Sequence, residues 1–258
     1  MSVVLQEKRG RVTIVTMNRP ESLNGFTTDL RLGLLKALQD AAADTSVRAV
    51  VLTGAGRGFS AGADLKAEPM TSGAQVERML NDEYGAALRT IVTMAKPVIA
   101  AVNGFATGIG GSFALACDLV VMGENAFFQV PFQKLGLVPD GGMCWLLTER
   151  VGHRRAFEIA VSGERVPAAR CLEWGLANRV VPDEQVVDAS VAWADELCEA
   201  APIALGYMKQ LLRGAPGMGY EQTIRAEARL QAPCIDSADF LEGVTAFREK
   251  RAPKFAGR

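Results

Sequence analysis

One acidic side chain in the second half of the chain lies in surroundings that suit acid–base chemistry. Asp140 ends the turn Leu135–Asp140, and an apolar helix is expected to begin near Met143. Apolar surroundings disfavour the charged form of a carboxyl group and raise its pKa, towards the range in which it exchanges protons near neutral pH. The structural alternative is an ordinary N-cap, because aspartate is a preferred residue just before a helix. Asp140 is therefore the first candidate for a catalytic acid or base.

A glycine-rich turn between an apolar strand and a small-residue helix is the second such feature. It lies in the stretch Lys96–Asp118, where the run Val98–Val102 has the character of a strand buried on both faces. A strand, a glycine turn and a helix start aim unpaired backbone N–H groups and the positive end of a helix dipole at one point. The pattern predicts a site for negative charge, either permanent or formed during a reaction.

The glycine-rich runs do not match nucleotide-binding motifs. Gly108–Phe113 and Gly54–Phe59 each lack the last glycine of the G-x-G-x-x-G pattern, and no Gly-Lys-Ser/Thr sequence follows them. A dinucleotide or a nucleoside triphosphate is therefore not expected at either turn.

The segment Gly58–Gly62 matches the nucleophile-elbow pattern G-x-S-x-G, with Ser60 in the centre. A catalytic triad in chain order would need Asp140 and then His153, which is the single histidine of the sequence. His153 opens a basic helix with a long helical segment after it, whereas a hydrolase histidine normally lies near the end of its domain. The serine-hydrolase interpretation stays a minor alternative, and His153 is expected to be a solvated residue at a helix start.

The elements that must position these residues alternate along the first two thirds of the chain. The expected strands are Val3–Lys8, Val12–Met17, Arg48–Thr53, Val98–Val102, Leu119–Met122 and Ala126–Phe128. The expected helices begin at Thr27 or Thr28, at Ala74 (ending at Met94), after Gly108 and at Met143, and from about Asp183 only helices follow, among them Pro202–Gly214 and Ala238–Lys250. This order predicts an α/β fold, with a largely parallel sheet, helical crossovers and a helical C-terminal part.

Composition excludes several classes of partner. The chain has 258 residues, a net charge of −1, 49% hydrophobic and 22% charged residues. Neither nucleic acid nor an anionic membrane surface is expected to bind it, and no apolar run reaches membrane-spanning length. Residues 1–9 lack the apolar core of a signal peptide, so a cytoplasmic location is expected. The five cysteines include no Cys-x-x-Cys pair, which predicts buried reduced thiols without a metal site or a disulfide framework.

Several segments, in order along nearly the whole chain, resemble the crotonase family, the enoyl-CoA hydratase/isomerase superfamily. They are Asn18–Asn24, Gly58–Leu65, Lys96–Asp118, Leu135–Gly142, Glu173–Ala177 and Glu242–Arg251. The resemblance implies a spiral of β-β-α units in residues 1–195, which holds the acyl-CoA site, and a helical trimerisation region in residues 196–258. It also implies acyl-CoA thioesters as substrates and homotrimers, often paired into hexamers. No metal or redox cofactor is expected, because coenzyme A is part of the substrate.

The resemblance also assigns site residues. The backbone N–H groups of Ala63 and Ile109 would form an oxyanion hole for a thioester enolate, which agrees with the position of Ile109 at the helix-opening turn. The positions that would contact coenzyme A are Leu23, Asn24, Arg57, Ala61, Asp64, Leu65 and Lys66, joined by Phe247 and Lys250 from a C-terminal helix that often belongs to another subunit. The structural alternative for each charged residue among them is a solvated surface charge.

Two departures from the family pattern bear on the reaction. Ser112 and Phe132 occupy the positions at which hydratases carry two glutamates, so ordinary hydration by that mechanism is not expected. Asp140 remains, and its turn resembles the subgroup that isomerises ring-1,2-epoxyphenylacetyl-CoA in phenylacetate breakdown. Met143 stands where a smaller residue is usual, and is expected to narrow the acyl pocket.

The first prediction is therefore an acyl-CoA isomerase that moves a proton or a double bond through an enolate. An enoyl-CoA hydratase of atypical activity is the second, with water held by Asp140 or by Glu83. Hydrolytic dehalogenation would need a histidine near Ala63, where the sequence has none. A non-catalytic acyl-CoA binder is the alternative from another class.

Overall fold

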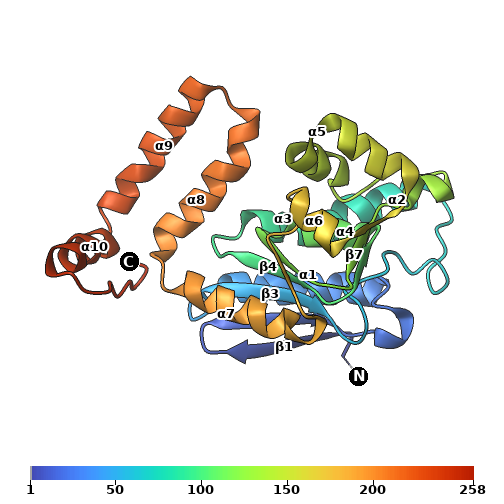
Figure 1. Ribbon diagram of the computed structural model, residues 1–258, viewed down its shortest axis with the longest axis horizontal. Helices are drawn as coiled ribbons and strands as arrows, with labels where there is room; N and C mark the ends of the chain where they lie inside the picture. The colour runs from blue at the N-terminus through green and yellow to red at the C-terminus, as the bar shows by residue number, and fades with distance from the viewer. Residues whose placement is uncertain (1) are drawn as a thin grey trace.

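The computed structural model describes residues 2–258 and is built around a six-stranded sheet in the order β1-β2-β3-β4-β6-β9 (Figure 1). The strands are β1 (Val4–Arg9), β2 (Val12–Met17), β3 (Ala49–Gly54), β4 (Val98–Val102), β6 (Leu119–Gly123) and β9 (Arg179–Val181). The strands β1 and β2 pair antiparallel, while the other neighbours in this sheet pair in parallel. The first two expected strands form an antiparallel hairpin, and the prediction of a largely parallel sheet is confirmed.

Helices cover both faces of the main sheet. The helix α7 (Val186–Cys198) packs on one face, and α1 (Thr28–Ala43), α3 (Gly85–Thr93) and α4 (Ile109–Ala116) lie on the other. Because both faces are covered, every residue of β3 and β4 is buried. The continuous apolar run Val98–Val102 is therefore a central strand, as its sequence predicts.

A second, three-stranded sheet was not predicted as a separate layer. It consists of β5 (Phe105–Thr107), β7 (Phe127–Gln129) and β8 (Arg165–Pro167). Each of β5 and β7 follows a main-sheet strand directly, and β5 then leads into α4. The order β4-β5-α4 is thus one β-β-α unit of the expected spiral. It carries the chain from the sheet to the glycine turn.

The helix expected over residues 74–94 is interrupted. The structure has α2 (Gly73–Arg78), a π-helical turn η2 (Met79–Tyr84) and then α3. A π-helical turn inserts one residue into the helical register and is frequent at functional sites. The remaining elements of the core are α5 (Met143–Ser162), α6 (Ala168–Glu173) and the short 3₁₀ turns η1 (Pro20–Ser22), η3 (Phe132–Leu135) and η4 (Asp183–Gln185).

The C-terminal helices extend away from this core as an arm (Figure 1). They are α8 (Pro202–Gly214), α9 (Tyr220–Ile235) and α10 (Ala238–Glu249), with a 3₁₀ turn η5 (Ala215–Gly217) between α8 and α9. The boundary expected after residue 195 falls inside α7, and Cys198 on its last turn still packs in the core cluster. The arm therefore begins after Cys198.

The expected burial of the cysteines is found for only part of them. Cys117, Cys171 and Cys198 are buried, but Cys144 is exposed on the first turn of α5, so the expectation of buried thiols is wrong there. The outward face of that turn also exposes its neighbour Trp145 by 49%.

Within residues 2–258, none of the helices combines the length and the apolar character needed to cross a membrane.

Candidate active site

The glycine turn opens α4 and leaves its first N–H groups without backbone partners. Gly108 precedes the helix with φ 56° and ψ −132°, a conformation that residues with a side chain rarely adopt. Ile109 is the first helical residue, so its N–H has no partner within the helix, and none is found elsewhere in residues 2–258. A side chain on Gly110 would place its Cβ 2.7 Å from the Cβ of Ser60, so α4 lies tightly against that loop.

The loop beside this turn carries the second predicted donor, Ala63. Ala63 forms a parallel bridge with Phe26, in which the Phe26 N–H donates to Gly62 O at 2.8 Å and the Asp64 N–H donates to Phe26 O at 3.0 Å. The N–H of Ala63 itself therefore points away from Phe26, and it has no partner among the described residues. A Cβ on Gly62 would lie 3.7 Å from Gly108 Cα. The two segments that bear the predicted oxyanion-hole donors are neighbours in space.

The turn that carries Asp140 is fixed against the first turn of α4. The backbone oxygen of Asp140 accepts hydrogen bonds from Ser112 Oγ at 2.9 Å and from the Met143 N–H at 3.1 Å. A Cβ on Gly141 would lie 2.5 Å from Ile109 Cδ1. The N-cap of α5 is Gly142, without a side-chain hydrogen bond, so the interpretation of Asp140 as an ordinary N-cap is wrong.

The Asp140 residue is partly exposed, but one of its carboxyl oxygens is removed from water. Its Oδ1 is buried and has no hydrogen-bond partner within residues 2–258. Burial raises the pKa of Asp140 from 3.8 to about 6, because desolvation disfavours the carboxylate. A carboxyl group with such a pKa can take up and release protons near neutral pH.

A cavity of about 880 Å³ lies between this turn and the interrupted helix α2-η2-α3. Asp140 lines it, and the other lining side chains are mostly apolar: Met70, Val76, Leu80, Leu88, Val92, Leu137 and Val138. Met143 is fully buried in the core and does not line this cavity, so the expected narrowing of the pocket by Met143 is not found. The cavity can accept an apolar acyl group beside the carboxylate.

The two positions at which a hydratase would carry glutamates have structural roles. Ser112 is fully buried and donates its hydroxyl to the Asp140 backbone. Phe132 is also buried, and its ring lies 3.8 Å from where a Cβ on Gly108 would be. Glu83, the other carboxylate considered for holding water, forms an ion pair with Arg31.

The loops predicted to contact coenzyme A lie together, while the C-terminal contributors lie apart. Leu23 and Asn24 both have left-handed backbones, with φ of 57° and 53°. The Asn24 amide is buried and donates to the backbone oxygens of Ala55 and Gly58, both at 2.8 Å, so its side chain shapes the loop. Phe247 on α10, which is 85% exposed, belongs to the opposite end of the molecule (Figure 1).

The charged and exposed positions among the predicted contacts differ in their environment. Asp64 accepts hydrogen bonds from the Ala67 N–H and from Arg19, and both lower the pKa of its carboxyl group. The others are exposed: Arg57, Ala61, Leu65, Lys66 and Lys250. A role of these residues in binding coenzyme A stays a prediction.

The elbow motif does not form a catalytic triad. Ser60 is fully buried, donates to Asn24 O at 2.8 Å and accepts from the Gly62 N–H at 3.2 Å. His153 is exposed on α5, as predicted, just after a break in that helix at Gly152. The serine-hydrolase interpretation is therefore wrong.

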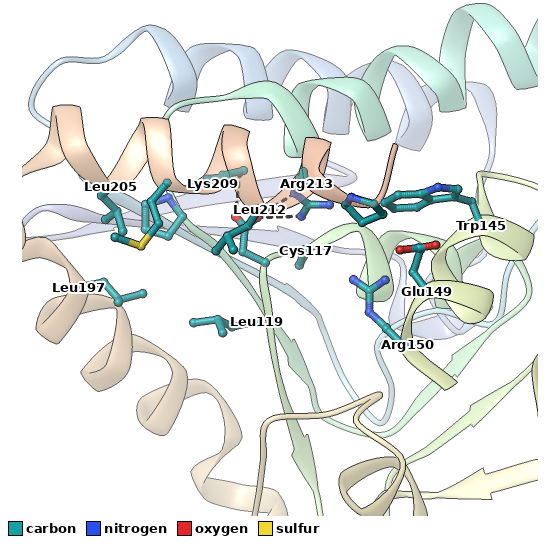
Figure 2. A pocket seen from close by; sticks show the side chains of 14 residues that line it. Cys117, Leu119, Trp145, Glu149, Arg150, Leu197, Leu205, Lys209, Leu212 and Arg213 are labelled. Carbon is teal, nitrogen blue, oxygen red and sulfur yellow. Dashed lines mark hydrogen bonds and ion pairs between the residues drawn. The ribbon is translucent and has the colours of Figure 1, made fainter. Parts of the chain in front are cut away.

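The C-terminal end of α4 is enclosed by charged side chains around a second cavity of about 450 Å³ (Figure 2). Arg213 donates to Ala116 O at 2.6 Å and to the Asp118 carboxylate at 2.7 Å, and Lys209 lies 2.7 Å from the same carboxylate. Arg150 of α5 donates to Leu115 O at 2.7 Å. These bonds satisfy the last carbonyls of the helix and attach α8 to the core.

The family model described as "Enoyl-CoA hydratase/isomerase" matches residues 7–258. The chain belongs to this enoyl-CoA hydratase/isomerase family. The crotonase fold predicted from the sequence is thereby confirmed.

Family members that are named as isomerases and as hydratases resemble the chain over nearly its full length. A 1,2-epoxyphenylacetyl-CoA isomerase of Escherichia coli (strain K12) is 36% identical, with 100% of both chains covered. A putative enoyl-CoA hydratase of Thermus thermophilus is 39% identical over 98% of this chain and 100% of the relative. A crystal structure of an enoyl-CoA hydratase subunit I from Geobacillus kaustophilus has a TM-score of 0.94 at 32% identity, covering 99% of this chain and 98% of that one.

Sequence reasoning missed three features of this enoyl-CoA hydratase/isomerase site. The hydrogen bond from Ser112 to the Asp140 backbone depends on a contact between distant segments, which no local pattern reveals. The hydrogen bonds from Arg150 and Arg213 to the last carbonyls of α4 also join distant segments and were missed for the same reason. In the sequence, Tyr84 lies in phase with Leu80, Leu88 and Ile91 and so belongs to an apolar helix face, although the hydroxyl of a tyrosine at such a position usually needs a hydrogen-bond partner.

Proposed function

We propose that this chain is an acyl-CoA isomerase in which Asp140 transfers a proton between two carbons of the acyl group. The observation that carries the proposal is the Asp140 Oδ1 atom, buried without a partner beside the 880 Å³ cavity. The Ser112 hydrogen bond holds the same residue against the first turn of α4, close to Ile109. The proposed base therefore lies next to the turn that bears one of the proposed donors, Ile109, and the other, Ala63, lies on the loop beside that turn.

The proposed reaction balances with a single carboxyl group. The Asp140 carboxylate removes a proton from C2 of a 3-enoyl-CoA, and the electron pair moves onto the thioester oxygen. The N–H groups of Ala63 and Ile109 stabilise the resulting dienolate, and each such donor is worth about 2.7–4 kcal/mol in comparable sites. The neutral Asp140 then returns the proton to C4, the double bond moves to C2–C3, and the carboxylate is restored.

The identity of the acyl group is a more specific part of the proposal. The apolar lining of the cavity suits a ring or a short hydrocarbon chain. A full-length relative at 36% identity bears the name 1,2-epoxyphenylacetyl-CoA isomerase, which supports a ring-epoxide substrate. Hydration of a 2-enoyl-CoA is the second candidate, favoured by the hydratase name of a relative at 39% identity.

Assembly is part of the same proposal. The arm α8–α10 exposes large apolar side chains: Met208, Leu212, Tyr220, Ile224, Ile235, Phe240, Leu241 and Phe247. A homotrimer or hexamer would cover such a surface. Phe247 and Lys250 would then contact the coenzyme A bound to a neighbouring copy, because α10 stands far from the cavity of its own chain (Figure 1).

Replacing Asp140 by asparagine tests the reaction. The protein is incubated in deuterated water with 3-hexenoyl-CoA, with crotonyl-CoA and with ring-1,2-epoxyphenylacetyl-CoA. We expect Asp140→Asn to reduce double-bond migration and deuterium incorporation by about 10²–10⁴-fold, the usual contribution of a general acid–base group. Glu149→Gln, a change on the surface of α5, is the control and should leave the rate unchanged.

Each contrary outcome points to a different function. Water addition to crotonyl-CoA that survives Asp140→Asn would contradict the isomerase and favour a hydratase that uses another group. Tight binding of every thioester without turnover would indicate a non-catalytic acyl-CoA binder.

A further inference from the structure

The last residue of the π-helical turn presents a buried hydroxyl group that the proposed reaction does not use. Tyr84 is 1% exposed, and its Oη has no hydrogen-bond partner within residues 2–258. Its ring is fixed by Phe26, at 5.4 Å between ring centroids, and by Phe113, at 6.4 Å. The Arg31 guanidinium lies 5.2 Å from the centroid on the ring face. The orientation of the phenol is therefore set by packing on several sides.

Tyr84 lines a cavity of about 440 Å³ that adjoins the predicted oxyanion hole. Ala63 belongs to the same wall, and Met70 and Val76 line both this cavity and the larger one at Asp140. The two cavities thus share part of one wall, and Ala63 lines the smaller of them, the one that Tyr84 lines.

Most other polar groups of this wall already have partners. Glu68 and Glu83 form ion pairs with Arg31, and Glu68 also accepts hydrogen bonds from the Thr28 N–H and hydroxyl. Tyr84 differs because a buried, rigidly held donor in the described wall is left unsatisfied. An unsatisfied buried polar group is costly, and a ligand atom that pairs with it removes that cost.

The phenol is suited to donate a hydrogen bond and not to act as a base. Burial raises the pKa of Tyr84, and this rise outweighs the lowering by the neighbouring Arg31 guanidinium, while the negative charge of Asp140 adds a smaller rise. The hydroxyl therefore keeps its proton at neutral pH.

We propose that the Tyr84 hydroxyl donates a hydrogen bond to an oxygen atom carried by the acyl group, which makes the site selective for oxygenated acyl-CoA thioesters over hydrocarbon ones. The proposal rests on the acyl-CoA function proposed above and deepens it. A site built to bond a substrate oxygen strongly rejects the analogue that lacks it, because the protein donor is then left unpaired.

Matched thioesters that cannot be turned over by double-bond migration test this selectivity. Isothermal titration calorimetry compares phenylacetyl-CoA with 2-hydroxyphenylacetyl-CoA, and butyryl-CoA with 4-hydroxybutyryl-CoA. The wild-type protein should bind the hydroxylated member of at least one pair about 10-fold or more tightly than its partner. Tyr84→Phe should abolish the preference by weakening the hydroxylated ligand, while the Kd of the unhydroxylated one stays within about twofold of the wild-type value.

Tyr220→Phe is the matched control, since Tyr220 is 81% exposed on the arm, and it should keep the wild-type preference. Tyr84→Phe should also keep or raise Tm, because it removes an unsatisfied buried hydroxyl. If Tyr84→Phe loses selectivity without losing stability, the hydroxyl acts on the ligand and not only on the fold.

The result that would overturn this inference is binding of both members of each pair with equal Kd by the wild type, or an unchanged preference in Tyr84→Phe. Either result leaves the isomerase proposal intact. If none of the four thioesters binds to the wild type, the proposed acyl-CoA function and this inference fall together.

Discussion

The two ends of α4 are treated in opposite ways. At the N-terminal end the Ile109 N–H is left unpaired, and Gly108 provides the backbone turn that precedes it. At the C-terminal end, Arg150 donates a hydrogen bond to the carbonyl of Leu115, and Arg213 donates one to the carbonyl of Ala116. A helix has unsatisfied groups at both ends, and this one keeps those at the end that faces the proposed chemistry. In this helix, the N–H group without a hydrogen-bond partner is available for binding, whereas the hydrogen-bonded carbonyl groups contribute to stability.

The filled end should be the place where stability is most easily lost. Asp118→Ala would leave Lys209 and Arg213, whose side chains are 8% and 16% exposed, without their carboxylate. Removing one partner of a buried ion pair costs about 3–5 kcal/mol, and we expect a loss near the lower bound. Urea unfolding gives the free energy of unfolding, and kcat of the folded variant should change little.

Glu173→Ala is the matched control for Asp118→Ala. Glu173 pairs with Arg170 on the surface, with side chains 60% and 53% exposed, and its loss should cost under about 1 kcal/mol. Equal losses from the two variants would show that the ion pairs of Asp118 are worth no more than a surface ion pair.

The open end should be the place where activity is most easily lost. Gly108→Ala forces a side chain onto a backbone with φ 56° and moves the Ile109 N–H. Loss of one such donor costs about 2.7–4 kcal/mol of transition-state stabilisation, so kcat should fall about 10²–10³-fold with a smaller change in KM. Steady-state kinetics with 3-hexenoyl-CoA measures both.

Gly175→Ala separates backbone strain from donor displacement. Gly175 has φ 75° and open space around its Cβ position, so the substitution strains the backbone away from the cavity. It should lower stability without lowering kcat. A similar kcat loss in both variants would show that strain, and not the position of the donor, limits the reaction.

The buried carboxyl group should make stability and activity depend on pH in opposite directions. Folding raises the pKa of Asp140 from 3.8 to about 6, so the folded state favours the protonated form. The resulting stabilisation, up to about 3 kcal/mol, is complete below pH 3.8 and is lost as the pH rises through about 6. The activity needs the carboxylate and should rise with an apparent pKa of about 6.

Urea titrations of the wild type and of Asp140→Asn at pH 4 to 8 test the stability part, because the difference between the two proteins isolates this group. Parallel stability profiles would mean that the carboxyl group is solvated in the folded protein.

The smallest expected effect concerns the tether between α4 and the Asp140 turn. Ser112→Ala removes the hydrogen bond to the Asp140 backbone and should cost about 1 kcal/mol of stability. A modest fall in kcat of about threefold to tenfold is expected, because misplacement of a reacting group lowers its effectiveness. Ser190→Ala, which breaks a bond from a buried hydroxyl to the Val186 backbone on α7, is the control and should affect stability alone.

The fold was predictable where the sequence has long periodic or continuous apolar segments. The run Val98–Val102 is buried as expected, and so are Leu30, Leu34 and Leu38, whose helical spacing in the sequence places them on one face. The second sheet was not predicted as such, because β5 and β8 are three residues long and their pairing is between distant segments. The π-helical turn was missed because one inserted residue hardly disturbs an apolar pattern.

The site was predictable to the level of residue types and not of contacts. The surroundings of Asp140 in the sequence already indicated a raised pKa, and burial in the structure raises it. The tether from Ser112 and the unpaired hydroxyl of Tyr84 arise only when separate segments pack together. Cys144 was misplaced because cysteine type alone does not reveal which face of α5 it occupies.

The helix α4 consists of eight buried residues, Ile109–Ala116, and none of them carries a charge. The electric field along this helix can therefore be adjusted only by residues that belong to other segments, such as Arg150, Arg213 and Asp140. Substitutions of these residues can thus change the reactivity at the glycine turn while the helix of this chain keeps its sequence and its packing.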